Sequence, residues 1–332
     1  MDFPNNTIDD IQSDNGWDKY WNLAGTGGAF SSKGTEESLF KQQWFQLFEK
    51  MLAQTSKVRI LDVASGNGLL ATLATSYFNK RAISPELYCL DSSSSAISSI
   101  RQRLPKIHGT VANANDMPYE SNTFDLVVSQ FGIEYADKSA ITETARVLSS
   151  NGEAMFICHF RNGEIFLQCN QQLEIIKCFL ESDFLNYCQD AFSKKVGLNQ
   201  KNTPLSEFKK SDQKLRSAAK KVHQILTKYE QEPASQTLNL ILADISVMYK
   251  NVNAYRKQDL FVWLQVTINE IEAYRFRMKS MINAALDGSA VGKMVGQMLD
   301  LGLEIIQVKP MRFSQEEKNI AWLLHAKTTT TN

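Results

Sequence analysis

The stretch from Arg59 to Ala71, RILDVASGNGLLA, constrains the fold of this chain most strongly. Its first part is apolar and partly β-branched, which is typical of a strand covered on both faces of a parallel sheet. Gly66 and Gly68 then allow the backbone to turn sharply and to approach a ligand without a Cβ in the way. A helix is expected from about Leu69 to Tyr77, with its first amides pointing into the crevice where α/β sheets bind ligands. The stretch therefore predicts a mononucleotide-binding junction.

A carboxylate ends the next apolar strand, Leu87 to Asp91. It lies about twenty residues beyond the glycines, where such folds place the acid that accepts hydrogen bonds from ribose hydroxyls. Asp91 is equally well placed to cap the helix that opens at Ser92, and the two roles are compatible. Glycines in such a turn can be needed for its backbone conformation alone, so the evidence for ligand binding comes from the downstream acid, Asp91.

Strands and helices are predicted to alternate from residue 58 to residue 160, which indicates a parallel sheet with right-handed crossovers. The later strands are expected at about His108–Ala112, Phe124–Phe131, Glu153–Phe160, Leu303–Val308 and Ala321–Ala326. The last two would complete a Rossmann-like sheet, so the helical region between them and the fifth strand is an insertion.

The insertion, residues 161–287, carries three apolar stripes at helical spacing. They run from Leu173 to Tyr187, from Leu238 to Val252 and from Leu260 to Ile282, and three such stripes pack into a small bundle. The predicted organisation is an N-terminal helical cap or flap over residues 1–54, a ligand-binding core over 55–160 and 288–332, and this helical segment. Because the insertion leaves the carboxyl edge of strand five, it is expected to act as a lid.

Aromatic residues cluster at Trp17–Trp21 and precede a glycine-rich stretch, Ala24–Phe30. They form either a helix packed on the core with a loop behind it, or a flap whose aromatics close over a ligand. A further amphipathic helix is predicted from about Glu36 to Leu52.

The chain has 36 Lys and Arg and 36 Asp and Glu, so its formal net charge is zero. This balance excludes an overall positive electrostatic potential that would favour nucleic acid or an anionic membrane. Residues 194–232 are locally basic, with ten Lys or Arg against four acids. This segment is either a nucleic-acid or anionic-lipid patch or a solvated helix face, and the second is favoured because only Phe208 and Tyr229 could stack on bases.

Cysteine usage indicates reduced thiols of a cytoplasmic protein, since the five cysteines include no C-x-x-C pair. They are Cys89, Cys158, Cys169, Cys178 and Cys188. No metal site, secretion signal or apolar run of the roughly 20 residues that span a bilayer is expected.

Several weaker motifs follow in a fixed order. They are Leu61–Gly68, Asp91, Asn113–Tyr119 before Phe124–Val127, and Arg146–Leu148 before Asn151 and Gly152. Together they resemble class I S-adenosylmethionine-dependent methyltransferases of the methyltransferase type 11 kind, over residues 55–160 and the end of the chain. The resemblance implies an α/β, Rossmann-like doubly wound sheet of seven strands with the last strand antiparallel. Ala64 stands where the family usually has glycine and Asn113 where it usually has an acid. Since alanine tolerates most geometries other than positive φ, Ala64 is expected to be a mild change.

The resemblance also implies a donor, S-adenosyl-L-methionine, with S-adenosyl-L-homocysteine as its product. Asp62 would orient the ammonium group, the glycines would make room for methionine and ribose, and Asp91 would hold the ribose hydroxyls. The implied cofactor-binding residues are Asp62, Ala64, Ser65, Gly66, Asn67, Gly68, Asp91, Ser92 along the adenine, Asn113 and Ala114 at the adenine edge, and Gln130 and Phe131 at the reacting centre. A nicotinamide dinucleotide is disfavoured because no second glycine turn is found.

Methyl transfer is an in-line displacement, so the protein mainly aligns the reactants and excludes water. An amine or hydroxyl acceptor also needs a base, for which His159 and Tyr135 are the candidates. His159 could instead be a structural histidine at a strand end. Candidate acceptor contacts are Trp21, Phe30, Tyr255 and Tyr274, which at helical spacing could equally be core.

The sequence thus predicts a methyltransferase that acts on a small-molecule acceptor under a helical lid. Two alternatives stay open: a nucleic-acid methyltransferase that docks through residues 194–232, and a non-catalytic module that binds the donor. The acceptor atom and the oligomeric state are left open.

Overall fold

The computed structural model describes residues 17–18, 20–21, 35–52, 58–312 and 318–329. The chain forms two compact units, one of Met1–Leu167 with Ser280–Asn332 and one of Gln168–Lys279. The helical unit is shorter than the predicted insertion, residues 161–287, by seven residues at its start and eight at its end, and both of its boundaries fall inside helices.

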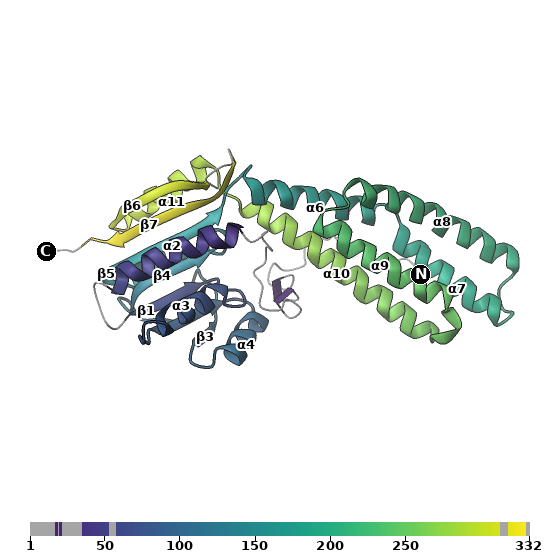
Figure 1. Cartoon of the computed structure of the whole chain (residues 1–332), viewed down its shortest axis with the longest axis horizontal. Coiled ribbons are helices and arrows are strands. Elements are labelled where there is room, and N and C mark those ends of the chain that lie inside the picture. Colours follow the sequence, from purple (N-terminus) through teal and green to yellow (C-terminus); the bar gives the residue numbers. More distant parts are fainter. Residues whose placement is uncertain (1–16, 19, 22–34, 53–57, 313–317, 330–332) are drawn as a thin grey trace. The chain divides into compact units, whose positions relative to one another are not determined.

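The first unit is built on a seven-stranded sheet with the order β3-β2-β1-β4-β5-β7-β6 (Figure 1). The strands are β1 Arg59–Val63, β2 Glu86–Asp91, β3 His108–Val111, β4 Phe124–Gln130, β5 Leu148–His159, β6 Leu303–Arg312 and β7 Asn319–Thr328. Strands β1 to β5 pair in parallel, whereas β7 runs antiparallel to both β5 and β6. The predicted fold class, with its antiparallel last strand, is confirmed.

Helices of the first unit pack against the sheet and against one another. These helices are α2 Thr35–Leu52, α3 Leu69–Asn79, α4 Ser94–Arg103, α5 Ser139–Val147 and α11 Gly288–Asp300. Helix α2 contacts α3 through Phe48, which is fully buried and lies 5.3 Å from Phe78 between ring centroids. Helix α11 contacts α5 and β6, and Ile141 and Val291 belong to one apolar core with the strand residues Leu61 and Phe156. Each such large apolar side chain contributes about 1.5–3 kcal/mol by its burial.

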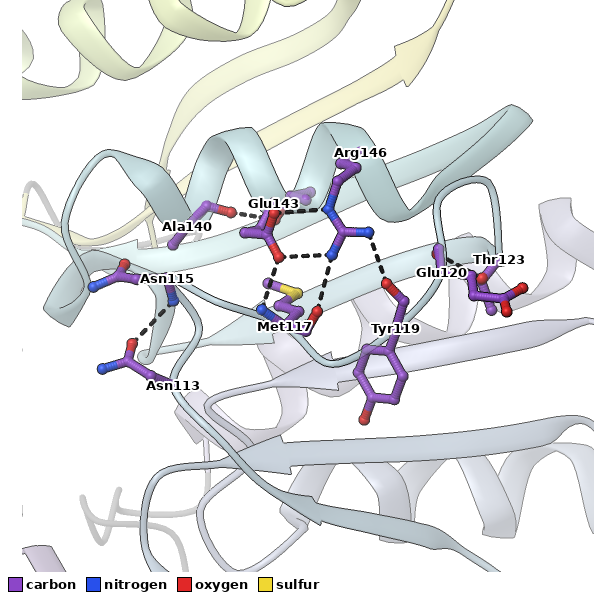
Figure 2. A network of polar contacts seen from close by, with 10 residues as sticks. Asn113, Asn115, Met117, Tyr119, Glu120, Thr123, Ala140, Glu143 and Arg146 are labelled. Atoms are coloured by element: carbon purple, nitrogen blue, oxygen red, sulfur yellow. Dashed lines mark hydrogen bonds and ion pairs between the residues drawn. The ribbon is translucent and has the colours of Figure 1, made fainter.

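A loop, residues 112–123, connects β3 to β4 where the alternating pattern predicted a helix. The loop is fixed to α5 by Arg146, whose guanidinium donates to the carbonyl oxygens of Tyr119 at 2.7 Å and Met117 at 2.9 Å (Figure 2). Glu143 accepts from the Met117 amide at 2.7 Å and pairs with Arg146 at 2.7 Å. Because side chains satisfy these backbone groups, the connection needs no helix of its own.

The second unit is helical throughout (Figure 1). Its helices are α6 Glu164–Leu180, α7 Phe184–Asn199, α8 Leu205–Lys228, α9 Pro233–Lys250 and α10 Lys257–Ala284, with a 3₁₀ turn at Val252–Ala254. The prediction of one stripe from Leu173 to Tyr187 was wrong, because the chain turns at Asp183 with φ +56° and starts a new helix.

Helix α8 contains most of the basic segment, for which a solvated helix face was favoured, but its apolar stripe was not predicted. One face of it is buried, namely Ser211, Leu215, Ala218, Val222 and Leu226. Its lysine pairs lie on the solvent side, at the exposed positions Lys209, Lys210, Lys220 and Lys221. This arrangement is that of a solvated amphipathic helix face.

Candidate active site

The turn after β1 is tied to the end of β2. The Asp91 carboxylate accepts the Gly66 amide at 2.8 Å and the Ser93 amide at 2.9 Å. The Ser65 amide also donates to the carbonyl oxygen of Leu90 at 3.1 Å. The expected proximity of the acid and the glycine turn is therefore present. Helix α4 is capped by Ser93, whose Oγ accepts the Ala96 amide at 3.1 Å, and Asp91 holds the main chain of this cap residue.

Asp62 points its carboxylate into the same region from within β1. It is 3% exposed, and its Oδ2 has no hydrogen-bond partner among the residues that the structure describes. Burial and the nearby negative charge of Asp91 raise the pKa of Asp62 well above its usual range, although the amide of Ala71 donates to it. A buried carboxylate with an open oxygen suits a cationic ligand group.

Ala64 departs from the expectation of a mild change. Its φ is +53°, the left-handed region that alanine disfavours, by about 1–2 kcal/mol. A Cβ on Gly132 would lie 2.7 Å from the Ala64 Cβ, so the ends of β1 and β4 approach closely there. The position thus requires the conformation for which glycine is suited, and this chain accepts strained alanine instead.

Trp21 covers Gly66. A Cβ added to Gly66, whose φ is +52°, would lie 2.6 Å from Cζ2 of the Trp21 ring. The short N-terminal segment that carries this ring is fixed by Asp18, which accepts from Ser93 Oγ at 2.7 Å and from the Ser95 amide at 3.0 Å. Trp21 therefore lies at the glycine turn, and its closing over a ligand stays a prediction.

Gly68 has a different environment from the one the sequence suggested. Its φ is +79°, and a Cβ there would lie 2.8 Å from the Ile100 side chain. Glycine is needed at this position for the turn and for the close approach of α4, and Gly68 is not part of the cavity wall.

A cavity of about 310 Å³ opens beside these residues. Its lining includes nine of the predicted cofactor-binding residues, Asp62, Ala64, Ser65, Gly66, Asn67, Asp91, Ser92, Gln130 and Phe131, together with Trp21, Tyr135 and His159. This volume is within the range of small-molecule pockets, roughly 300–1,000 Å³. The loops after β1, β2 and β4 therefore form one pocket.

Part of the cavity lining is aromatic. The His159 ring stacks on Phe131, with centroids 4.4 Å apart and planes 14° apart. Tyr135 Oη lies 3.0 Å from His159 Nε2, and the Tyr135 ring meets Trp17 edge to face at 5.6 Å. Burial lowers the pKa of His159 from 6.5 to about 3, so the imidazole is neutral at physiological pH. A neutral imidazole has a nitrogen lone pair that can accept a proton, although at this pKa it is a weak base in the free protein.

Gln130 is oriented by a residue outside the predicted site. Its Oε1 accepts from Trp44 Nε1 of α2 at 2.6 Å. The side chain thus has a fixed direction at the end of β4, next to the cavity.

Asn113 and Ala114 do not line the cavity. Asn113 Oδ1 accepts the Asn115 amide at 2.9 Å, in the loop that Arg146 holds (Figure 2). Ala114 is buried in the apolar core. Their contact with an adenine edge stays a prediction.

The remaining acceptor candidates lie elsewhere. Phe30 is outside the described residues. Tyr255 and Tyr274 belong to the helical unit, where Tyr255 is exposed and Tyr274 donates a hydrogen bond to Gln172. Their role in acceptor binding stays a prediction.

Sequence reasoning missed several wall residues, namely Trp17 as a contact, Phe40, Lys41, Leu69, Leu70, Leu73, Gly132 and Met281. The start of α3 could have been inferred from the glycine turn, because the first residues of that helix face the crevice. Phe40 and Met281 come from distant segments, and nothing local in the sequence links them to this site.

The described residues contain no cluster of His, Cys, Asp or Glu that could hold a metal ion. None of the five cysteines, all of which lie in the described ranges, forms a disulfide bond. None of the helices in the described part is long and apolar enough to cross a bilayer.

Strand order, antiparallel β7, glycine turn and the acid at the end of β2 together define the class I methyltransferase fold, whose donor is S-adenosylmethionine. Residues 61–156 match the family model described as a methyltransferase domain. This part of the chain is thus similar in sequence to methyltransferase domains.

Two curated relatives share this region. The ubiquinone/menaquinone biosynthesis C-methyltransferase UbiE of Dinoroseobacter shibae is 31% identical over 122 residues, which cover 34% of this chain and 47% of the relative. The demethylmenaquinone methyltransferase of Thermotoga maritima is 26% identical over 117 residues, 35% of this chain and 49% of the relative. The chain thus spans about half the length of each relative that it matches.

A solved geranyl diphosphate C-methyltransferase from Streptomyces coelicolor A3(2) is 14% identical, with a TM-score of 0.34. The match covers 46% of this chain and 66% of that one. A TM-score this low supports no inference about function.

Proposed function

We propose that this chain transfers a methyl group from S-adenosylmethionine to a small-molecule acceptor. The observation that carries the proposal is one cavity whose lining combines the buried acids Asp62 and Asp91 with aromatic side chains and a neutral histidine. The donor would supply a methyl group on a sulfonium, which is electrophilic without further activation.

The carboxylate side fits the donor. Asp62 Oδ2, which has no partner within the described part of the chain, would bind the ammonium group. Asp91 already accepts two amides, but a carboxylate has about four acceptor positions and can also accept ribose hydroxyls. Ser92 and Gly66 would line the bound nucleoside.

The aromatic side suits an apolar or flat acceptor. Trp17, Phe131 and Tyr135 would exclude water and orient the acceptor, and His159 would take up a proton where the acceptor must lose one. The names of the two curated relatives refer to quinone biosynthesis, which also favours a small-molecule acceptor.

The helical unit is proposed to control access to the cavity. The chain leaves the sheet directly after His159, which lines the cavity, and Met281, in the segment where the chain returns, lines it too. Tyr255 and Tyr274 would contact the acceptor from this unit.

The test is transfer of tritium from methyl-labelled S-adenosylmethionine into a cell extract that is then separated into organic-soluble compounds, protein and RNA. Label in the organic-soluble compounds is expected. Lys209→Glu combined with Lys220→Glu on the solvent face of α8 should leave labelling unchanged.

Label in RNA that the lysine variants abolish would instead support docking through α8. Binding of S-adenosylhomocysteine without labelling of any fraction would favour the non-catalytic module.

A further inference from the structure

A buried acid, Glu134, lies behind the aromatic wall without being part of it. It belongs to the 3₁₀ turn Ile133–Tyr135 that follows β4, is 8% exposed, and is not a cavity-lining residue. Burial raises the pKa of Glu134 to about 7. An ionisable side chain in such a place is costly, so its contacts need an explanation.

Glu134 Oε1 accepts the main-chain amide of His159 at 2.8 Å. The last parallel pair between β4 and β5 is Gln130 with Ile157, and the Phe131 amide donates to the Ile157 carbonyl oxygen at 2.7 Å. Beyond it β4 has ended, so no β4 carbonyl pairs with the His159 amide. The Glu134 carboxylate supplies the acceptor that the strand would have provided.

Three further contacts fix the same histidine. Its carbonyl oxygen accepts the Leu286 amide at 2.8 Å. Its ring lies against Phe131 and its Nε2 meets Tyr135 Oη at 3.0 Å. Tyr135 directly follows Glu134, so one short turn holds both the main chain and the ring of His159. Nδ1 is the ring atom left without a partner among the described residues.

We infer that Glu134 is a positioning residue for His159: its carboxyl group anchors the His159 main chain, so that Nε2–H donates to Tyr135 Oη and Nδ1 keeps the lone pair that can accept a proton. The inference rests on the proposed function, in which His159 is the proton acceptor. Among the described residues, the titratable side chains next to His159 are Glu134 and Tyr135 from the turn and Cys158 from β5. The Cys158 thiol lies against the Glu134 carboxyl group.

The test uses the full chain labelled with ¹⁵N-histidine, because the imidazole nitrogens report tautomer and protonation directly without a known acceptor. The chain has four histidines, and His159→Gln identifies the signal of interest. In the wild type we expect one neutral tautomer that persists below pH 5, because burial lowers the pKa of His159 to about 3.

Glu134→Gln keeps an oxygen that accepts the amide and should retain the wild-type signal, whereas Glu134→Ala should give mixed tautomers and a pKa shifted towards 6.5. His108, His223 and His325 serve as internal controls and should not move. If Glu134→Ala fails to fold, Glu134→Asp, whose carboxylate is one methylene shorter, should show the same loss.

A His159 signal that is identical in the wild type, Glu134→Ala and Glu134→Asp would overturn the positioning role. So would Glu134→Gln shifting the signal as far as Glu134→Ala does. Calorimetric titration of the same proteins with S-adenosylhomocysteine separates this outcome from failure of the proposed function. If the wild type does not bind this product, the methyl-transfer proposal fails whatever the histidine signals show.

Discussion

Replacing Asp62 by Asn should stabilise the free protein and weaken donor binding. Burial and Asp91 raise the pKa of Asp62, so the folded state holds a proton that the unfolded chain releases above the ordinary pKa of 3.8. The contribution of Asp62 to the free energy of unfolding therefore decreases as pH rises from 3.8 to the pKa of Asp62 in the folded state. Each unit of pKa difference corresponds to about 1.4 kcal/mol, a penalty that asparagine does not incur.

Donor binding should change in the opposite sense. A hydrogen bond to a charged group is worth about 1.5–3 kcal/mol, so Asp62→Asn should weaken S-adenosylhomocysteine binding roughly 10- to 150-fold. Because the ionised form binds the ammonium, wild-type affinity should also rise with pH and binding should release protons. Titration calorimetry in buffers of different ionisation enthalpy measures both effects.

The matched control is Asp125→Asn, which removes the same charge from the start of β4, where Asp125 accepts the Arg59 amide at 2.8 Å. This variant should bind S-adenosylhomocysteine as the wild type does. The reasoning is refuted if Asp62→Asn is no more stable than the wild type in urea unfolding at pH 8, or if it binds the product equally well.

Three further changes have expected outcomes. Gly66→Ala should displace Trp21, whose ring lies 2.6 Å from the new Cβ, and shift the tryptophan emission; unchanged emission and S-adenosylhomocysteine affinity would contradict the packing. Glu153→Gln should lower the free energy of unfolding by about 2 kcal/mol at neutral pH, because the buried carboxylate bonds to His325 at 2.7 Å. Burial alone would raise the pKa of Glu153, but hydrogen bonds, chiefly from His325, lower it. The difference in free energy of unfolding between the wild type and Glu153→Gln should therefore disappear as pH falls below 4.5. A difference that stays constant with pH would contradict the role of the ionised carboxylate. Glu134→Gln should remove a loss of stability of about 3 kcal/mol between pH 4.5 and 7, seen as a flatter pH profile in chemical unfolding, since the native pKa is about 7.

The part of the site that the sequence predicted is the part that local rules determine. Asp62, Gly66 and Asp91 come together because parallel strands end at one edge of the sheet and a glycine turn must lie beside the next strand. Gln130 and Phe131 follow from the same rule applied to β4.

What the sequence did not predict depends on distant contacts or on weak patterns. Met281 lies more than a hundred residues from the other wall residues, and no local signal connects it to them. Helix α8 does show apolar positions at helical spacing, such as Leu215, Val222 and Leu226, but the lysines between them concealed the pattern. The strain at Ala64 could not be read from alanine itself, since it arises from the turn that the surrounding sheet imposes.

Backbone strain and buried acids occur together at the cavity, although five of the seven described non-glycine residues with positive φ lie elsewhere. Ala64 and Phe131 have φ of +53° and +55°, at the ends of two neighbouring strands, and Asp62 and Glu134 are buried acids with raised pKa values. Away from the cavity, the buried acid Glu153 is paired with a cation and has a lowered pKa. A sequence selected for stability alone would not combine strained backbone with buried acids whose pKa values are raised. The presence of strained residues and buried acids around one pocket is expected if the pocket binds a ligand. A carboxylate is required to bind a cation, and a particular backbone geometry is required to orient an imidazole, even though the free protein is less stable with them.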